Sequence, residues 1–396
     1  MDYDVAVIGA GLTGLSLALA LARAGRRVAV LDTRPPPRLE LPPPGRFDTR
    51  IYAIGPPAAR WLEQSRVWGA LDGARLSPVY DMRVQGDAAP ALGSGLALSS
   101  YRAGVDLLCT IVEENEIARG LAAAARYAAG LDLLRPVTPV ALETREQSIR
   151  IVLADGREVA AGLLVGADGA ASWTRERAGI AVDVHDYQMS AVVANFACAK
   201  PHHGTAMQWF REEADGNLGI LAWLPLPGDN LSIVWSVSSA QARALMEEDA
   251  HAFAARVAAA GGEALGALAP TGERALFALA SRRARALVAP RIALVGDAAH
   301  VVHPLAGQGL NLGFGDCAAL HAALEGARDC GDRGRLRAYE RARKAATAEM
   351  HAVTHGLARL FAHRHPLVRA LRNAGLNLAG RMPVLPELLV RGAIRG

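Results

Sequence analysis

Residues 5–32 combine an apolar strand, a glycine-rich turn, an apolar helix and a second apolar strand, and this pattern constrains the fold more than any other feature. The glycines of a G-x-G-x-x-G motif, Gly9, Gly11 and Gly14, fall between the first strand and the helix. In such a unit the first glycine allows a tight turn, the second lets a diphosphate approach the backbone, and the third lets the helix pack closely on the strand. The segment therefore predicts a Rossmann-like unit that binds a dinucleotide.

Two further groups of this unit suit a dinucleotide. The N-terminus of the helix presents free N–H groups and the positive end of its dipole to a diphosphate. Asp32 ends the second strand, 18 residues after Gly14, where its carboxylate can accept hydrogen bonds from ribose hydroxyls. These groups do not distinguish FAD from NAD, and a unit without a ligand is the alternative.

The composition suits a globular enzyme in a reducing compartment. Hydrophobic residues make up 51% and charged residues 21% of the 396 residues, which is enough for two domains. The four cysteines form no C-x-x-C pair, so we expect neither a metal site nor a redox dithiol. The uncharged run 5–22 follows two acidic residues and contains the three glycines, which argues against a signal peptide or a membrane span. We therefore expect a cytoplasmic protein.

Strand-like alternation interrupts the α/β framework near residues 76–102 and 180–280. Helices are expected over 57–68, 110–130 and 239–259, whereas the proline-rich run 34–45 is expected on the surface. The predicted fold is α/β with α+β character: a Rossmann-like domain, an inserted β-sheet domain that binds the substrate, and a C-terminal helical region. The expected boundaries are 1–75, 104–175 and 285–396 for the first domain with the C-terminal helices, and 76–103 and 176–284 for the second.

A second glycine-rich segment, "HPLAGQGLNLG" at residues 303–313, follows the buried strand of "RIALVGDAAH". The strand should deliver Asp297 to a strand end, where open α/β sheets bind ligands. Bare backbone N–H groups at the start of the next helix could approach a flat, electron-rich ring. This segment is therefore expected to contact the end of the dinucleotide opposite to the first motif; a flexible loop is the alternative.

Three elements now stand in order along the chain: the first glycine motif, "GADG" at 166–169 and "GD" at 296–297. Together they resemble the three signatures of the para-hydroxybenzoate-hydroxylase-like FAD monooxygenases. The run "HPLAGQGLNLG", the "DTR" of residues 48–50, "VYDMRV", "IVEEN" and "LPLPG" are more narrowly similar to the ubiquinone-biosynthesis hydroxylases of that group. The resemblance covers nearly the whole chain and implies a Rossmann-like FAD-binding domain.

The resemblance also implies roles for single residues. Arg50 would lie beside the flavin ring or the diphosphate, Asp168 belongs to a motif linked with FAD and pyridine nucleotides, and Asp297 would hold the ribityl chain. The departures are Asp32, where the family has Glu, and the acid Glu114, which we leave off the site. The ADP half would be held by Gly9, Gly11, Leu12, Thr13, Gly14 and Asp32, and the isoalloxazine would be lined by Pro304, Gly307, Gln308, Gly309, Leu310 and Asn311.

Several of these residues have a purely structural alternative. Asp168 could cap the helix that follows it, and Arg50 could form an ordinary surface ion pair. His300 and His303 have no carboxylate or cysteine at a spacing suited to a metal, so we expect structural histidines and no metal. No general base is evident, which leaves Arg50 and Pro304 as the candidates that line the reacting ring.

The activity implied by the resemblance is hydroxylation of an aromatic ring with FAD, O2 and NADH or NADPH as a transient electron donor, since no second dinucleotide motif is present. The implied substrate is a polyprenylated phenolic precursor of ubiquinone. The alternatives are a hydroxylase of a small soluble aromatic, a flavin reductase of the same fold, and a scaffold without turnover. The wall of the substrate pocket, or alternatively core packing, is expected from Met189, Trp209, Trp223, Leu224 and Trp235.

The C-terminal region is strongly basic. Residues 328–396 carry 13 Arg and one Lys against five acidic residues. Arginines interleaved with Leu, Phe and Val could bind the anionic surface at the inner face of a membrane, or a partner in a biosynthetic complex. Packing against the first domain is the alternative, and we expect no nucleic acid partner.

Overall fold

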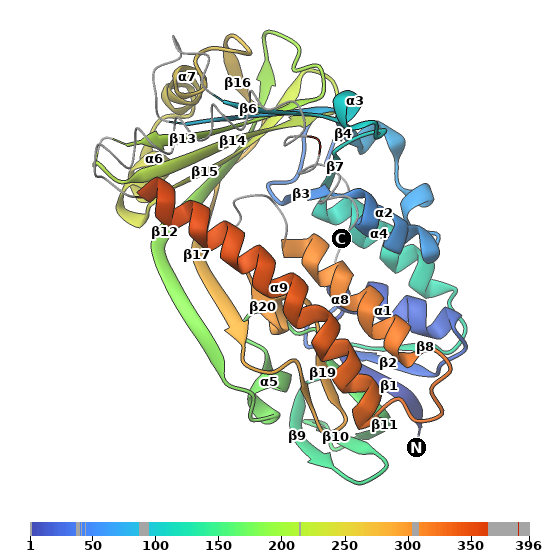
Figure 1. Cartoon of the computed structure of the whole chain (residues 1–396). Coiled ribbons are helices and arrows are strands. Elements are labelled where there is room, and N and C mark those ends of the chain that lie inside the picture. Colours follow the sequence, from blue (N-terminus) through green and yellow to red (C-terminus); the bar gives the residue numbers. More distant parts are fainter. Residues whose placement is uncertain are drawn as a thin grey trace.

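The computed structural model describes residues 2–36, 40, 42–43, 45–86, 95–213, 215–302, 309–362 and 387, with side chains of the last helix through Ala348. Two large sheets form the two ends of the molecule, and a long helix, α9 (Arg333–Ala362), runs from the first sheet toward the second (Figure 1). The mixed α/β architecture agrees with the fold predicted from the sequence.

The first sheet has a parallel core. Strand β1 (Tyr3–Ile8) pairs in parallel with β2 (Val28–Leu31) and with β11 (Glu158–Gly166). The sheet order β18-β19-β11-β1-β2-β8 adds two more parallel neighbours and one antiparallel edge strand. The remaining strands of this sheet are β8 (Leu131–Leu134), β9 (Pro139–Thr144), β10 (Ile149–Leu153), β18 (Val288–Ala289) and β19 (Ile292–Leu294).

Helices pack on one face of this sheet through a single apolar core. Helix α1 is buried along almost its whole length, and its neighbours contribute residues such as Trp61, Leu121, Phe314 and Tyr339. Helix α1 ends before Gly25, which has φ +82°, a conformation that glycine adopts easily. The helices of this layer are α1 (Leu12–Arg23), α2 (Pro56–Gln64), α4 (Glu114–Arg126), α8 (Gly309–Leu324) and α9, while α5 (Trp173–Arg177) lies near the other face (Figure 1).

The second sheet has the order β20-β17-β12-β15-β14-β13-β5-β6, with β16 beside β12. Its outer face is covered by α6 (Ser239–Glu247) and α7 (Ala250–Ala260) over a core that includes Trp223, Trp235 and Phe253. Its strands are β5 (Asp81–Gln85), β6 (Leu96–Ser99), β12 (Val182–Cys198), β13 (Thr205–Glu212), β14 (Leu218–Leu226), β15 (Asn230–Ser238), β16 (Leu268–Pro270), β17 (Ala275–Ala284) and β20 (His300–Val301).

A small third sheet lies between the two large ones. It contains β3 (Ile51–Ile54), β7 (Cys109–Glu113) and β4 (Ser77–Val79), with β7 in the middle. Ile111 of β7 packs with Ala206 and Leu226 of the second sheet, so the third sheet joins the two halves of the molecule. The short elements are α3 (Ser100–Ala103) and the 3-10 turns Trp68–Ala70, Gly73–Arg75 and Gly296–Ala298.

Three helix predictions need correction. The helix expected over 110–130 begins only at Glu114, because Thr110–Glu113 pair with β3 and β4 as a strand. The helix expected over 239–259 is two helices, since the Asp249 carboxylate accepts the N–H groups of His251 and Ala252 and starts a new one. The helix expected over 57–68 ends at Gln64.

Candidate functional site

Four of the predicted motif segments follow strands of the first sheet that run in parallel. Gly9 follows β1, Asp32 follows β2, "GADG" begins at the end of β11, and Gly296–Asp297 follow β19. Because parallel strands end at the same edge of a sheet, these segments meet there. The site predicted from separate parts of the chain is therefore one region of the structure.

The glycines of the first motif allow this close meeting. Gly9 has φ +108°, and a Cβ there would overlap the carbonyl oxygen of Ala167 in the second motif. A Cβ on Gly14 would overlap the carbonyl oxygen of Gly9 and lie 3.0 Å from the Ala167 side chain. Both positions require glycine for protein packing, independently of any ligand.

The late glycines lie beside the start of α1. A Cβ on Gly296 would lie 3.1 Å from the Thr13 side chain, and one on Gly313 would lie 3.0 Å from Thr13 Oγ1. The Cys317 thiol of α8 also donates to the carbonyl oxygen of Thr13 at 3.4 Å. The N-terminal turns of α1 and α8 are therefore neighbours, as the two-ended binding of one cofactor requires.

The start of α1 fits a diphosphate. Gly11 occupies the N-cap position, so no side chain caps the first N–H groups of the helix, and no acidic residue stands in its first turn. Among the described residues, a Cβ on Gly11 would meet no atom within 4 Å on the side of the turn where it would point. Uncapped amides, a helix dipole and open space together form a cradle for an anionic group.

Asp32 is already hydrogen-bonded within the protein. Its carboxylate accepts the backbone N–H of Ala10 at 2.8 Å, the N–H of Arg34 at 2.8 Å and the Arg34 guanidinium at 3.2 Å. Burial works against the charge, but these hydrogen bonds lower the pKa of Asp32 below its ordinary value. The carboxylate is therefore ionised at neutral pH, and a ribose would share it with the exposed Arg34.

Arg50 lies between the start of α4 and the second sheet. Its guanidinium pairs with the Glu114 carboxylate at 3.4 Å and lies 5.3 Å from the ring centre of Phe277 on β17. With 59% of the side chain exposed, the ion pair contributes little to stability. The surface ion pair foreseen as an alternative is thus present, and its partner is the acid that the sequence left off the site.

The segment that leads to Arg50 is anchored by the second sheet. The Asn195 amide on β12 donates to the carbonyl oxygens of Phe47 and Asp48, both at 2.9 Å. On the other side, the Asp48 N–H donates to Glu113 at 2.7 Å, and the Glu113 carboxylate forms a buried ion pair with Arg75 at 2.6 Å. Asn195 was not foreseen from the sequence, because no local pattern marks it.

Replacing Asn195 by leucine should remove both amide contacts while keeping the side-chain size. We expect a loss of about 1–3 kcal/mol in the free energy of unfolding, since the two carbonyl oxygens and the neighbouring strand lose a buried donor. Denaturant titration measures this loss. Asn230→Leu serves as the matched control, because the Asn230 amide bonds only to Pro227 in the β14–β15 turn; a loss confined to the control would contradict the anchoring role.

Asp168 supports the start of α5, whose N-cap residue is Ser172. Its carboxylate accepts the Ser172 hydroxyl at 2.5 Å and both the N–H and the hydroxyl of Thr174 at 2.9 and 3.0 Å. The buried Arg175 guanidinium then donates to the carbonyl oxygens of Ala170 and Ala298, both at 2.9 Å. The second motif is thus tied through Arg175 to the Gly296–Ala298 turn, a link that the sequence did not reveal.

The residues predicted around the flavin ring are only partly within the described structure. Pro304, Gly307 and Gln308 lie outside the described residues, whereas Gly309 and Leu310 form the first turn of α8. Asn311 accepts the Gly55 N–H at 2.9 Å and donates to the Ala53 carbonyl oxygen at 2.8 Å, which ties α8 to the end of β3. Desolvation by neighbouring protein atoms raises the pKa of Asp297 above its ordinary value, although the side chain remains accessible to solvent.

A buried charge cluster lies behind the Gly296–Asp297 turn. The fully buried Asp316 carboxylate on α8 contacts His300 Nε2 and Arg343 Nε, both at 2.7 Å, and accepts the Gly296 N–H at 2.9 Å. Burial disfavours both charges, but the contact between them raises the pKa of His300 and lowers that of Asp316. His300 therefore has a carboxylate partner after all. The sequence spacing did not reveal this partner, because only the packing of β20 and α8 brings the two residues together; the contact agrees with the structural role expected for His300.

The predicted wall of the substrate pocket needs a similar correction. Trp223 and Trp235 are fully buried under α7, and Trp209 packs at the edge of the same core. Leu224 instead packs toward β7 on the opposite face of the sheet, the face that also presents Phe277 to Arg50. The core-packing alternative therefore holds for the three tryptophans; Met189 is half-buried on β12.

Comparison with known proteins is consistent with this geometry. A family model described as "FAD binding domain" matches residues 90–354, and one described as "FAD dependent oxidoreductase" matches residues 4–39. The chain is 34% identical to the ubiquinone hydroxylase UbiL of Rhodospirillum rubrum, over 99% of this chain and 89% of that protein. It is 31% identical to the 3-demethoxyubiquinol 3-hydroxylase of Escherichia coli, over 99% and 98%.

Solved structures share the fold. HpxO of Klebsiella pneumoniae, crystallised with FAD and uric acid, aligns with a TM-score of 0.75 at 17% identity, over 99% of this chain and 98% of that one. Within the described ranges, no helix has the length and apolar character needed to cross a membrane. In the same residues no group of three His, Cys, Asp or Glu side chains is arranged to hold a metal ion.

Proposed function

The chain belongs to the FAD-binding-domain family of flavoprotein monooxygenases, and from this we propose that it inserts one oxygen atom from O2 into the aromatic ring of a ubiquinone precursor. The observation that carries the proposal is the meeting of four motif segments at one edge of the parallel sheet, beside the uncapped start of α1. The whole-length similarity to two ubiquinone hydroxylases supports the choice of substrate class.

The residues of this edge fit FAD in an extended form. The turn at Gly11 and the first N–H groups of α1 would hold the diphosphate, and Asp32 would accept the hydroxyls of the adenosine ribose. Asp297 would accept hydrogen bonds from the ribityl chain. A Cβ on Gly309 would meet none of the described atoms within 4 Å, and the flavin ring would approach the start of α8 there.

Bound FAD, once reduced by NADH or NADPH, supplies the activated oxygen that the protein alone lacks. The chain's own task is to hold the aromatic ring against the flavin and to exclude water. The inner face of the second sheet suits this task, because it presents apolar side chains such as Phe277 and Leu224 toward the first domain. Arg50 lies at the same boundary and would face the flavin or the diphosphate.

Finer parts of the proposal rest on the resemblance. We propose a polyprenylated phenol as substrate and a transient nicotinamide donor, since the chain holds one dinucleotide motif. Contact with the inner membrane face or with a biosynthetic complex through the basic C-terminal region is also a proposal. Residues 363–386 and 388–396 of that region lie outside the described residues.

The experiment uses the purified full-length chain with a water-soluble, short-chain demethoxyubiquinol analogue. We expect a yellow protein that releases about one FAD per chain, oxidises NADH or NADPH faster when the analogue is present, and transfers ¹⁸O from ¹⁸O₂ to the product. Mass spectrometry of the product reads out the transfer.

Three results would each overturn the assignment in a different way. Nicotinamide oxidation without labelled product indicates a reductase, and hydroxylation of simple soluble phenols alone indicates a different substrate class. A protein that carries FAD but oxidises no nicotinamide with any phenol indicates a scaffold. An argon-equilibrated sample is the control for the need for oxygen.

A further inference from the structure

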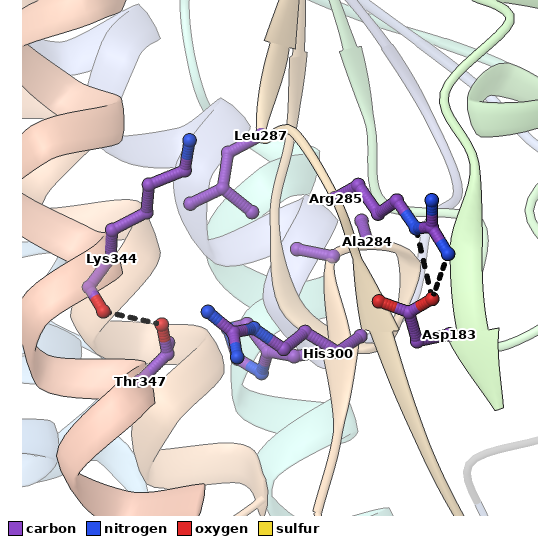
Figure 2. A pocket seen from close by; sticks show the side chains of 9 residues that line it. Asp183, Ala284, Arg285, Leu287, His300, Lys344 and Thr347 are labelled. Atoms are coloured by element: carbon purple, nitrogen blue, oxygen red, sulfur yellow. Dashed lines mark hydrogen bonds and ion pairs between the residues drawn. The ribbon is translucent and has the colours of Figure 1, made fainter. Parts of the chain in front are cut away.

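A pocket of about 240 Å³ opens on the side of the molecule where α9 crosses β17 and β20 (Figure 2). Lys344 and Thr347 line it from α9, the Asp183–Arg285 pair lies at the other side, and the His300 ring lies between them (Figure 2). Among the described residues, the segments predicted to bind the dinucleotide supply only Ala299 and His300 to the lining.

Strand register places three of the lining residues in one row. Asp183 of β12 pairs directly with Arg283 of β17, and Arg283 pairs directly with His300 of β20. Side chains directly opposite one another in neighbouring strands point to the same face, and here that face meets α9. The fold therefore brings an arginine, a histidine and a lysine to one pocket.

The acids near this pocket are already engaged. Asp183 accepts the Arg285 guanidinium at 2.7 and 2.9 Å, and Glu340 pairs with Lys344 at 3.1 Å within α9. Among the described residues, Arg283 has no acidic partner within ion-pair distance. The exposed guanidinium of Arg283 therefore faces the pocket with its charge uncompensated.

His300 adds an unsatisfied group to the pocket. Its side chain is 3% exposed, its Nε2 contacts Asp316 at 2.7 Å, and its buried Nδ1 has no hydrogen-bond partner among the residues that the structure describes. Contact with Asp316 raises the pKa of His300 and so favours the charged ring, against the effect of burial. A protonated ring carries an N–H at Nδ1, and a buried donor without an acceptor is costly.

The pocket therefore gathers the side chains of Arg283, Lys344 and His300, and of these three Arg283 has no acidic partner among the described residues. We propose that this pocket is a binding site for a phosphate group, held by the Arg283 guanidinium, the Lys344 ammonium and Nδ1 of His300. A phosphate supplies several acceptor oxygens and up to two negative charges, which matches three donors from three elements. The pocket volume admits the phosphate with only a small group attached.

The phosphate site does not depend on the proposed reaction. One residue, Asp316, connects it to the Gly296–Asp297 turn that is predicted to hold the ribityl chain of FAD. Asp316, which holds His300, also accepts the Gly296 N–H, the residue before Asp297. Phosphate binding should therefore stabilise the folded chain whether or not the chain hydroxylates an aromatic ring.

The test titrates inorganic phosphate into the FAD-loaded full chain at constant ionic strength, with chloride as the reference anion. We expect a saturable rise in melting temperature and measurable binding heat. Arg283→Ser combined with Lys344→Ser should weaken phosphate binding about tenfold or more, because two charge-assisted contacts are lost. Both side chains reach the surface, so the double variant should fold.

Arg243→Ser, an exposed arginine on α6 outside the pocket, is the matched control and should leave phosphate binding unchanged. No saturable phosphate effect in the unmodified chain, or equal binding by the double variant, overturns the proposal. Sedimentation with vesicles that contain phosphatidic acid distinguishes the source of the phosphate. Vesicle binding lost in the double variant assigns a lipid headgroup, whereas binding of soluble phosphate alone assigns a free or small-molecule phosphate.

Discussion

Replacing Gly14 by alanine is expected to destabilise the folded chain by about 3 kcal/mol and to abolish FAD retention. The added Cβ would overlap the carbonyl oxygen of Gly9 and touch the Ala167 side chain, and neither of these backbone segments can move without separating α1 from β1. Denaturant unfolding of the FAD-free chain measures the first effect, and FAD content after gel filtration measures the second.

The Gly11→Ala variant distinguishes an effect on protein packing from an effect on the approach of the cofactor. Its Cβ would meet no protein atom within 4 Å and its φ of −73° suits any residue, so we expect stability to change by less than about 1 kcal/mol. FAD retention should nevertheless fall strongly, because the methyl group occupies the space where the diphosphate would approach the turn. If Gly11→Ala retained FAD as well as the unmodified chain, the diphosphate would have to bind elsewhere.

Removing the carboxylate of Asp316 is expected to have the second large effect. Asp316→Ala removes the partner of the buried His300, leaves the Arg343 guanidinium as a buried charge without its carboxylate, and leaves the Gly296 N–H without its acceptor. Breaking a buried ion pair by removing one partner costs about 3–5 kcal/mol, and we expect a loss of unfolding free energy of that size. Chemical denaturation at neutral pH checks this value.

Glu143→Ala is the surface control for this experiment. Glu143 also contacts an arginine, Arg150, at 2.6 Å, but both partners are accessible to water and the loss should be far smaller. Asp316→Asn should fall between the two variants, because an amide oxygen can still accept the Gly296 N–H. Equal losses in Asp316→Ala and Glu143→Ala would mean that the buried cluster adds nothing to stability.

Local patterns predicted the elements well where the cause was local. The strand–turn–helix at the N-terminus follows from short-range backbone preferences and hydrophobic periodicity. The helix prediction for Thr110–Glu113 was wrong because these residues form a strand only by pairing with β3 and β4, which are distant in sequence. The division of the expected helix 239–259 at Asp249 could have been predicted from the sequence, since an aspartate before a helical run is a strong N-cap.

The candidate site shows the same division between local and distant causes. The glycine motifs and the strand-end acids could be listed from the sequence, because each needs only a particular residue after a particular strand. Asn195, Arg175 and the partnership of Asp316 with His300 could not, because each joins elements that the chain order does not place together. Asp168 has the contacts of a helix cap, which the sequence offered only as the alternative.

By itself, the sequence determined that a dinucleotide-binding unit opens the chain and that a second bare stretch of backbone follows a late buried strand. It could do so because backbone freedom at glycine and hydrophobic periodicity are properties of neighbouring residues. Only the tertiary structure decided which face of the second sheet is oriented toward the first domain, and which charged side chains form buried ion pairs. These outcomes depend on how separate elements pack, and a single chain order is compatible with many packings.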